Sequence, residues 1–316
     1  MTSLDRILIT GGAGFIGSNF THHILDQFEE IYVLDKLTYA GDLSNLESIR
    51  DEISFVQADI RDSEVVSELY TEVNYVVNFA AASHVDRSIE SGSPFVKNNV
   101  EGAYSLMENL REHDIKRFIQ ISTDEVYGSY ESGEASEDDP LDPSSPYSAS
   151  KASTDLFVNA CWETYDLPIT IVRPTNIYGP RQHTEKLIPK FISRAIQEEP
   201  LPLYGDGTNV RQWLYVHDFC NALQRILEDG RETVYNIAGP DRKSNLEVTR
   251  SILDRLGKPH ELIEFVEDRK GHDYRYALSD EKIRKEIDLE PFTPFEEGLV
   301  ETVEWYHNQI KESQNS

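Results

Sequence analysis

Short apolar runs alternate with helical patterns over the first 173 residues of this 316-residue chain. The runs fall at residues 6–10, 31–35, 53–57, 75–79, 117–121 and 169–173, and most of their side chains are β-branched or aromatic. Nearly continuous apolar runs of this kind are typical of parallel strands that are buried on both faces. Helical patterns lie between them, for example at residues 95–111 and 147–165. The alternation predicts an α/β fold with a Rossmann-type, doubly wound parallel sheet.

The pattern changes after Arg173. Prolines and glycines are frequent between residues 174 and 209, and helical patterns return at residues 217–227, 245–256 and 294–311. We therefore expect two domains. Residues 1–173, with about 210–237, form the sheet domain, and residues 174–209 and 238–316 form a smaller, mixed α/β domain over the carboxyl edge of the sheet.

A glycine series follows the first predicted strand. Gly11, Gly14 and Gly17 stand between this strand and a helix, where glycine permits a tight turn and lets backbone N–H groups approach a pyrophosphate. Asp35 closes the second strand, 18 residues after Gly17 (35 − 17), where a carboxylate can accept both ribose hydroxyls. A carboxylate repels a 2′-phosphate and so favours NAD over NADP, although the adjacent Lys36 weakens this preference. An ordinary strand–turn–helix would use the same glycines.

Two further segments follow predicted strands. Asp59 comes after the third strand and has two interpretations: it contacts the adenine of the cofactor, or it caps a helix expected at residues 62–70. Residues 78–83 (NFAAAS) end the fourth strand in small side chains, which would let a cofactor lie flat against the backbone.

Tyr147 and Lys151 occur in the sequence YSASK. Four residues apart on a helix, they share one face. The pKa of a tyrosine is ordinarily about 10, but a lysine cation and an oxidised nicotinamide would both stabilise its phenolate. The pair could then take a proton from a sugar hydroxyl while hydride leaves for the cofactor. This spacing is common by chance, but here it accompanies the glycine series and the pair Ser122 and Thr123 at the end of the fifth strand.

Asp124 and Glu125 follow directly in the segment ISTDEVYG. Adjacent acids are frequent in a chain with 57 acidic residues, so only position makes this pair informative. The pair lies just beyond a predicted parallel strand, and open α/β sheets collect their reactive groups beyond the carboxyl ends of such strands. The alternative is an acidic turn on the surface.

The chain carries 30 basic and 57 acidic residues, a formal net charge of −27. This charge repels nucleic acid and anionic membranes, so a site for an anionic substrate must gather basic groups locally. It serves either solubility or adaptation to high salt. No apolar run reaches about 18 residues and no signal-peptide core is present, so we expect a cytoplasmic protein. Cys161 and Cys220 are expected to be small core residues, and no metal site is expected.

Several motifs resemble those of the extended short-chain dehydrogenase/reductase family. They are TGGAGFIG, STDEVYG, YSASK and RPTNIYGP, with supporting blocks DKLTYAG, SHVDRSI, KLIP, PLYGDGTNVR, WLYVHD, SNLEV and DRKGHDYRYA over nearly the whole chain. The acids of STDEVYG are similar to those of its sugar-nucleotide 4,6-dehydratases. The resemblance implies a homodimeric lyase that uses NAD to oxidise dTDP-glucose at C4, remove water across C5 and C6, and return hydride to C6. Its product would be dTDP-4-keto-6-deoxyglucose, for deoxysugar biosynthesis.

The resemblance also implies roles for single residues. Glu125 would be the base at C5, Asp124 the acid at C6, and Thr123 a hydrogen-bond partner of the C4 oxygen beside Tyr147 and Lys151. The cofactor would contact Gly11, Gly14, Phe15, Ile16, Gly17, Asp35, Lys36, Leu37, Thr38, Asp59, Ile60, Ala80, Ala81, Ser83, Asn98, Tyr147 and Lys151. The nucleotide sugar would contact Ser83, His84, Thr123, Asn176, Lys186, Leu187, Pro202, Tyr204, Arg211, Asn245, Arg269 and His272.

Four positions depart from the pattern that the resemblance leads us to expect. Ala82 stands in place of a glutamate, Asn98 of a threonine, Gln212 of an aspartate and Lys270 of a proline. None of them is a catalytic group. The first two concern cofactor contacts, and the other two flank substrate-binding positions and so bear on which nucleotide is accepted.

Two other functions compete with the dehydratase. A UDP-sugar epimerase or decarboxylase shares the scaffold, and the epimerase also oxidises C4, but it expels no water and needs no acid pair. A cofactor-sensing regulator without catalysis would need neither Asp124 and Glu125 nor Tyr147 and Lys151. The intact groups therefore favour the dehydratase.

Overall fold

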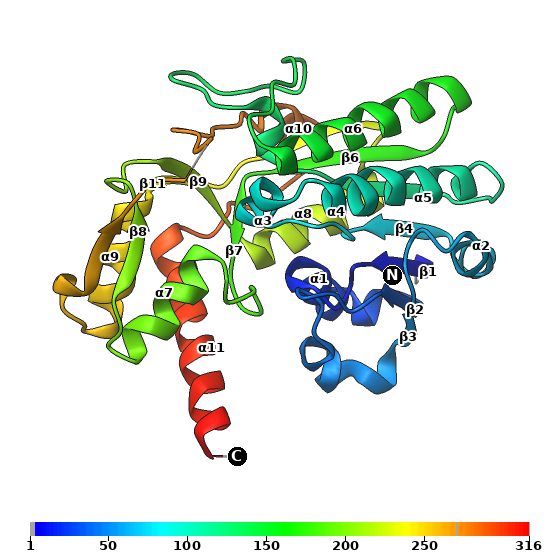
Figure 1. The fold of residues 1–316 in the computed structure, drawn as a ribbon. Coiled ribbons are helices and arrows are strands. Elements are labelled where there is room, and N and C mark those ends of the chain that lie inside the picture. Colours follow the sequence, from blue (N-terminus) through cyan, green and yellow to red (C-terminus); the bar gives the residue numbers. More distant parts are fainter. Residues whose placement is uncertain (1–3, 270, 316) are drawn as a thin grey trace.

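A seven-stranded parallel sheet forms the centre of the larger domain (Figure 1). The computed structural model describes residues 4–269 and 271–315. Within them the strands stand in the order β10-β6-β5-β4-β1-β2-β3, and all neighbours are parallel. The strands are β1 (Leu4–Thr10), β2 (Phe28–Asp35), β3 (Ser54–Gln57), β4 (Tyr75–Asn78), β5 (Arg117–Ile121), β6 (Ile169–Pro174) and β10 (Thr233–Ile237). The predicted doubly wound sheet is confirmed.

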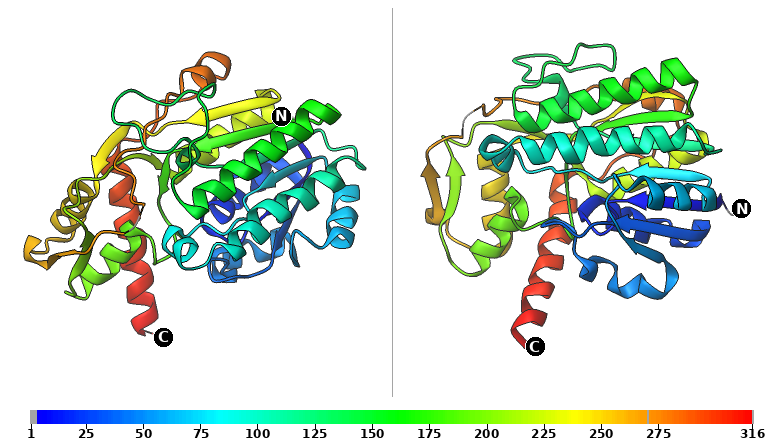
Figure 2. Two further views of the ribbon diagram at one scale, coloured as in Figure 1. Left: turned by 45° about the horizontal axis from the view of Figure 1, so that its top comes forward. Right: turned by 45° about the vertical axis from the view of Figure 1, so that its right-hand side comes forward.

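Helices cover both faces of this sheet (Figure 2). α1 (Phe15–His23) and α8 (Val216–Asp229) pack on one face, and α2 (Ser63–Glu72), α5 (Gly102–Leu110) and α6 (Pro146–Tyr165) pack on the other. Successive residues of a strand point to opposite faces, so Ile7 and Ile9 of β1 join the first layer and Leu8 joins the second. Both faces must therefore be apolar, which explains the nearly continuous apolar runs of the sequence.

Two predicted helices begin at capping boxes. Ser145 and Ser148 bond reciprocally at the start of α6, with Pro146 in its first turn. Ser244 and Glu247 do the same at the start of α9 (Asn245–Leu256). These local signals satisfy the first backbone N–H groups of each helix, so the observed starts lie at or within one residue of the predicted ones.

One predicted helix is interrupted. The helical pattern at residues 95–111 becomes α4 (Ser93–Phe95), a π-helical turn at Val96–Glu101, and α5. In this turn the side chain of Asn99 accepts the N–H of Ala82 at 2.7 Å and donates to the Ala82 carbonyl at 3.0 Å. Turns of this kind are frequent at functional sites. Here the turn ties the helix to the segment that follows β4.

The smaller domain lies on the side of the sheet opposite to the start of the chain (Figure 1). Its strands form the sheets β11-β9-β7 and β12-β8, and between β9 and β11 the chain returns to the central sheet as α8 and β10. The elements are β7 (Asn176–Tyr178), β8 (Leu201–Tyr204), β9 (Val210–Tyr215), β11 (Asp241–Ser244), β12 (Ile263–Val266), α7 (Leu187–Ile196), α9 and α11 (Phe295–Asn315). Short helices occur at α3 (Val85–Glu90) and α10 (Glu281–Glu286), with 3-10 helices at Leu25–Gln27, Leu43–Glu52, Asp124–Tyr127 and His260–Leu262.

An aromatic cluster holds the smaller domain together where it meets the sheet. The ring of Tyr178 lies 4.9 Å from that of Phe295 and 6.1 Å from that of Trp213, measured between centroids. The Tyr178 hydroxyl donates to the carbonyl of Phe295 at 3.0 Å. These three residues belong to the same hydrophobic core as Ile7 and Ile9 of β1. The two domains thus share one hydrophobic core.

Both cysteines are free and buried, as the sequence predicted. Cys161 lies on α6 and Cys220 on α8, in the two helical layers on opposite faces of the sheet. Across residues 4–269 and 271–315, none of the helices combines the length and the apolar character that a membrane crossing requires.

Candidate active site

The glycine-rich turn brings backbone close to backbone at the start of α1. Gly11 has a φ of 69°, and a Cβ at this position would lie 2.6 Å from the backbone nitrogen of Ala80. At Gly17 a Cβ would lie 2.4 Å from the carbonyl oxygen of Gly11. Only glycine fits at either position, and the amino end of α1 favours a bound anion. The turn therefore fits the pyrophosphate of a dinucleotide.

The carboxylate of Asp35 is held in place at the end of β2. Its Oδ1 accepts the N–H of Leu37 at 2.8 Å, and its Oδ2 accepts the N–H of Ala13 at 3.1 Å. Burial raises the pKa of Asp35, and these two hydrogen bonds oppose the rise. Each carboxylate oxygen has a second lone pair that can accept a ribose hydroxyl. The geometry fits the role that the sequence predicts.

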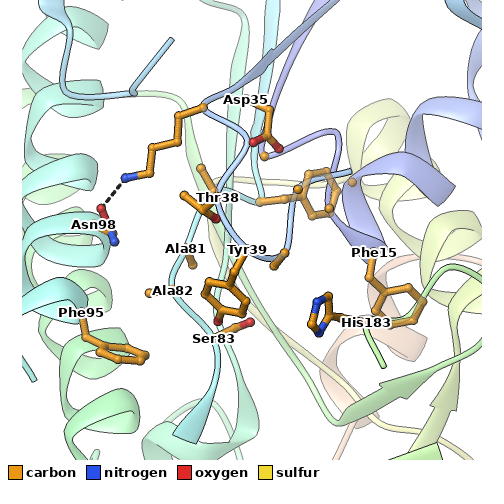
Figure 3. Close-up of a pocket in the computed structure, with 18 of the residues that line it drawn as sticks. Phe15, Asp35, Thr38, Tyr39, Ala81, Ala82, Ser83, Phe95, Asn98 and His183 are labelled. Carbon is orange, nitrogen blue, oxygen red and sulfur yellow. Dashed lines mark hydrogen bonds between the residues drawn. The ribbon is translucent and has the colours of Figure 1, made fainter. Parts of the chain in front are cut away.

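The cation of Lys36 is paired beside Asp35. Its Nζ donates to Asn98 Oδ1 at 2.6 Å (Figure 3) and to Asp59 Oδ2 at 3.2 Å. Hydrogen bonds from Arg61 are the main cause that lowers the pKa of Asp59. The N-cap of the following helix is Asp62, so the N-cap interpretation of Asp59 is wrong. Lys36 is thus already paired, and Asp35 presents a carboxylate that repels a 2′-phosphate, so the site favours NAD.

A cavity of about 520 Å³ runs from the glycine turn and Asp35 to the ends of β4 and β5 (Figure 3). This size is typical of a cofactor site. The predicted residues that line it are Gly11, Gly14, Phe15, Ile16, Gly17, Asp35, Lys36, Thr38, Asp59, Ile60, Ala80, Ala81, Ser83, Asn98, Tyr147 and Lys151. Leu37 is the one predicted cofactor residue outside this lining, because its side chain packs against the hydrophobic core.

The cavity also has lining residues that sequence reasoning missed. Tyr39, Arg87, Phe95 and His183 are among them. Tyr39 and Arg87 lie inside the motifs DKLTYAG and SHVDRSI, so these motifs could have identified them as cavity residues. Phe95 and His183 lie outside the quoted motifs and reach the cavity only through the fold.

Tyr147 and Lys151 are both buried in the first turns of α6. Lys151 Nζ donates to the carbonyl oxygen of Ile121, at the end of β5, at 2.6 Å. Burial lowers the pKa of Lys151 to about 8, and the charge of Asp155 opposes this shift. At neutral pH Lys151 is therefore still mostly a cation.

The hydroxyl of Tyr147 faces the residues that follow β5. Burial, and next the charge of Glu125, raise the pKa of Tyr147, whereas a hydrogen bond with Thr123 lowers it. The phenolate therefore depends on positive charge from Lys151 and from a bound nicotinamide. The fold thus brings together Tyr147, Lys151, Thr123 and Glu125, which the sequence separates by up to 28 residues (151 − 123).

Asp124 and Glu125 open a short 3-10 helix directly after β5. Thr123 Oγ1 accepts the N–H of Glu125 at 3.3 Å and donates to Asp124 Oδ1 at 3.1 Å. Asp124 is only 3% exposed, and its Oδ2 has no hydrogen-bond partner among the described residues. Burial, and next the charge of Glu125, raise the pKa of Asp124 to about 7. The pair is therefore no surface turn, and Asp124 can hold a proton near neutral pH.

Three cations face Glu125. Burial raises the pKa of Glu125, and the charges of Arg269, Lys186 and Arg211 oppose the rise. Lys186 Nζ donates to the carbonyl of Ser83 at 2.8 Å, at the rim of the cofactor cavity. Arg211 is 5% exposed, and its guanidinium donates to backbone carbonyls, including that of Val210 at 2.8 Å. This strongly acidic protein thus gathers positive charge at the place where an anionic substrate would need it.

Asp86 connects two predicted substrate residues to α3, and sequence reasoning missed it. The hydroxyl of Tyr204 donates to Asp86 Oδ2 at 3.4 Å, and Arg269 Nη1 lies 3.5 Å from Asp86 Oδ1. The imidazole Nδ1 of His272, another predicted substrate residue, lies 2.6 Å from Oδ1 of Asp268, four residues earlier in the chain.

The other predicted substrate residues are more scattered. His84 caps α3, Asn176 begins β7, Asn245 begins α9, Pro202 lies within β8, and Leu187 packs against the hydrophobic core. The side-chain oxygen of Asn176 is buried and has no hydrogen-bond partner in the described part of the chain.

The departures from the expected pattern have structural partners. Ala82 pairs through its backbone with Asn99, and Asn98 accepts from Lys36. Gln212 donates to the carbonyl of Gly239 at 2.7 Å and accepts the N–H of Leu278 at 3.1 Å, so it braces the segment around the site. Lys270 lies outside the described residues.

The dinucleotide turn, the tyrosine–lysine pair and the adjacent acids Asp124 and Glu125 define an NAD-dependent enzyme of the extended short-chain dehydrogenase/reductase class. A family model described as GDP-mannose 4,6 dehydratase matches residues 8–302. The chain therefore belongs to the family of this model, GDP-mannose 4,6 dehydratase.

Relatives and solved structures agree with this assignment. The chain is 52% identical to Low-salt glycan biosynthesis protein Agl12 of Haloferax volcanii, over 95% of this chain and 98% of that one. It is 45% identical to a dTDP-glucose 4,6-dehydratase of Streptomyces niveus, over 96% and 93%. The crystal structure of DesIV, a dTDP-glucose 4,6-dehydratase from Streptomyces venezuelae with NAD bound, matches with a TM-score of 0.95 at 43% identity, over 97% and 98%.

Proposed function

We propose that this protein is an NAD-dependent 4,6-dehydratase that converts dTDP-glucose into dTDP-4-keto-6-deoxyglucose. The observation that carries the proposal is the acid pair beside Tyr147, in which Asp124 is buried and Glu125 is half-buried. With NAD as the hydride acceptor, oxidation at C4 needs only the tyrosine–lysine pair from the protein, whereas loss of water also needs a base and an acid. The relatives from Streptomyces niveus and Streptomyces venezuelae are named for this activity.

The first step is removal of a proton from the C4 hydroxyl. Tyr147 takes this proton, and the cation of Lys151 stabilises the phenolate that accepts it. Thr123 hydrogen-bonds the C4 oxygen. The glycine turn and Asp35 would hold NAD, which would supply a hydride acceptor for C4 and later a hydride donor for C6.

The second step is loss of water across C5 and C6. The C4 ketone makes the C5 proton acidic, and Glu125 removes it. Asp124 holds a proton near neutral pH and gives it to the C6 hydroxyl, which leaves as water while a double bond forms between C5 and C6. Glu125 would then give its proton back to C5, and with a hydride restored at C6 the reaction would be redox-neutral overall.

Binding of the substrate diphosphate falls to the cations that face Glu125. Within the described residues, the hydrogen bonds of the Arg211 guanidinium go to the backbone carbonyls of Val210, Asp273 and Tyr274, so its charge is available to a phosphate. Arg269 and Lys186 add positive charge from two other segments. A diphosphate there would place the attached hexose beside Asp124, Glu125 and Tyr147.

We further propose that the protein is a cytoplasmic homodimer. α5 and α6 lie side by side (Figure 1) and expose large apolar side chains: Leu156 is 63% exposed, Tyr104 is 50% exposed and Tyr165 is 45% exposed. Apolar groups gathered on adjacent helices are typical of an interface. Sedimentation of the wild type beside Leu156→Glu tests this, because a charge in a dimer interface should shift the protein to monomers.

The decisive experiment is mass spectrometry of the product formed from dTDP-glucose, with UDP-glucose in parallel. We expect a product that has lost one water and that absorbs in alkali as a 4-keto sugar. Tyr147→Phe serves as the blank, because it lacks the group that starts the reaction. Formation of dTDP-galactose alone would refute dehydration and support an epimerase. Protein that binds NAD but alters no sugar nucleotide would support a regulator.

A further inference from the structure

Side chains from three separate segments stand between the cofactor cavity and solvent. Tyr39 comes from the loop after β2, Arg87 from α3, and His183 from the loop between β7 and α7. All three line the cavity, yet Tyr39 is 39% exposed and the side chain of Arg87 is 45% exposed. In Figure 3 the ring of Tyr39 reaches from its own loop toward Ser83, with His183 on its other side. These residues thus form a roof over part of the cavity.

Arg87 joins the parts of this roof. Its guanidinium lies over the ring of Tyr39, 4.0 Å from the centroid, and donates a hydrogen bond to the carboxylate of Glu185. The ring of His183 meets that of Tyr39 edge-on, with centroids 5.8 Å apart. Glu185 also lies 3.6 Å from the imidazole of His84. One side chain therefore bridges the loop after β2 and the loop before α7.

Both loops contain a residue in an unfavourable backbone conformation. Leu37 has a φ of 56° and Arg181 a φ of 67°, a region that residues other than glycine rarely adopt. Such conformations persist only where surrounding contacts hold them, and they are found at ligand clamps. The contacts that Arg87 makes to Tyr39 and Glu185 lie within a few residues of these two positions, so loss of the bridge would let both loops relax.

We propose that Arg87 is a cofactor-retaining residue, which fastens Tyr39 and Glu185 over bound NAD and slows its release. This rests on the proposed function, because the hydride taken from C4 has to return to C6 of the same sugar. A protein that lost NADH between the two transfers would leave the sugar oxidised at C4, with no hydride to complete the reaction. Opening the roof requires that the ion pair with Glu185 and the stacking on Tyr39 be broken together.

Release of NADH tests this without any sugar. Protein loaded with NADH is mixed with excess NAD⁺, and the loss of NADH fluorescence gives the release rate. Arg87→Met keeps a long apolar stem but removes the cation. We expect this variant to release NADH about tenfold faster than the wild type, because exposed ion pairs and cation–π contacts are of modest strength.

Arg284→Met is the matched control. Arg284 also stacks on an aromatic ring, that of Phe292, at 4.5 Å and pairs with an acid, Asp280, at 2.6 Å. It lies on α10 and is not among the residues that line the cavity. Its replacement should leave NADH release at the wild-type rate. Equal release by the wild type and Arg87→Met, or equal acceleration in both variants, would overturn the proposal.

Two further measurements separate retention from general damage. Glu185→Gln should also speed release, and the double variant should be no faster than the faster single variant, because both act on one contact. Turnover by Arg87→Met should fade in buffer without NAD and recover when NAD is added, which a misfolded site would not do. Additive effects of the two substitutions, or fading without recovery, would count against the assignment.

The outcomes distinguish this inference from the proposed reaction. Dehydration of dTDP-glucose with no change in NADH release on Arg87→Met overturns the role of Arg87 alone. Faster release without any dehydration supports the role of Arg87 and overturns only the proposed reaction.

Discussion

Replacing Asp124 with asparagine should stabilise the protein at alkaline pH while it stops dehydration. The carboxyl of Asp124 is 3% exposed, and burial with the charge of Glu125 raises its pKa from 3.8 to about 7. Asparagine has nearly the same shape and can still accept the hydrogen bond from Thr123 Oγ1. The substitution therefore removes the ionisation and the catalytic proton with little change in packing.

The magnitude follows from the difference between the two pKa values. A rise from 3.8 to about 7 is about 3 units, or about 4 kcal/mol at about 1.4 kcal/mol per unit. Between these pKa values the folded protein holds a proton at Asp124 that the unfolded chain has lost. Wild-type stability therefore falls as the pH rises through this window, whereas the asparagine contributes no such dependence.

Urea unfolding of both proteins from pH 5 to pH 8, at constant salt, measures this effect. The advantage of Asp124→Asn in the free energy of unfolding should grow by about 3 kcal/mol over that range and level off above pH 7. In parallel, the rate of dehydration should fall by about 100-fold or more, because the general acid is lost. An advantage that does not change with pH, or a wild type that is the more stable protein at pH 8, would refute the burial argument.

Three other substitutions or conditions test the site and the surface. Glu125→Gln removes the base at C5 but leaves Tyr147, so fluorescence should show bound NADH accumulating without 6-deoxy product; unimpaired turnover would contradict the role of Glu125. Arg211→Met should raise the KM for dTDP-glucose by about 10- to 100-fold with a smaller change in kcat, because it removes hydrogen bonds to a charged diphosphate; an equal loss in kcat would place Arg211 in the chemical step instead. The net charge of −27 predicts that the free energy of unfolding rises with KCl concentration, since salt screens the repulsion among carboxylates; a flat dependence would leave solubility as the role of the acids.

Local chemistry in the sequence determined much of the part of the site that we propose binds the cofactor. Gly11 and Gly17 fit a turn that excludes a Cβ, and Asp35 ends a strand that its own apolar pattern defines. The capping boxes of α6 and α9 mark where those helices begin. On α6, the spacing of four residues places Tyr147 and Lys151 on one face. Each of these features depends on residues close together in the chain, which is why the glycine turn, the end of this strand and the starts of the two helices could be predicted from the sequence, although the capping boxes themselves were not.

Only the tertiary structure decided the features that depend on distant segments. Asp59 pairs with Lys36 and Arg61 instead of capping a helix. A π-helical turn interrupts an expected helix, and Asn99 of this turn contacts the distant Ala82. The roof that Arg87 builds requires three segments to meet above the cofactor cavity. Above all, the pKa of Asp124 is set by what surrounds it, and composition alone would have made it one more surface acid among 57. Burial and electrostatic fields are properties of packing, and packing is decided when the whole chain folds.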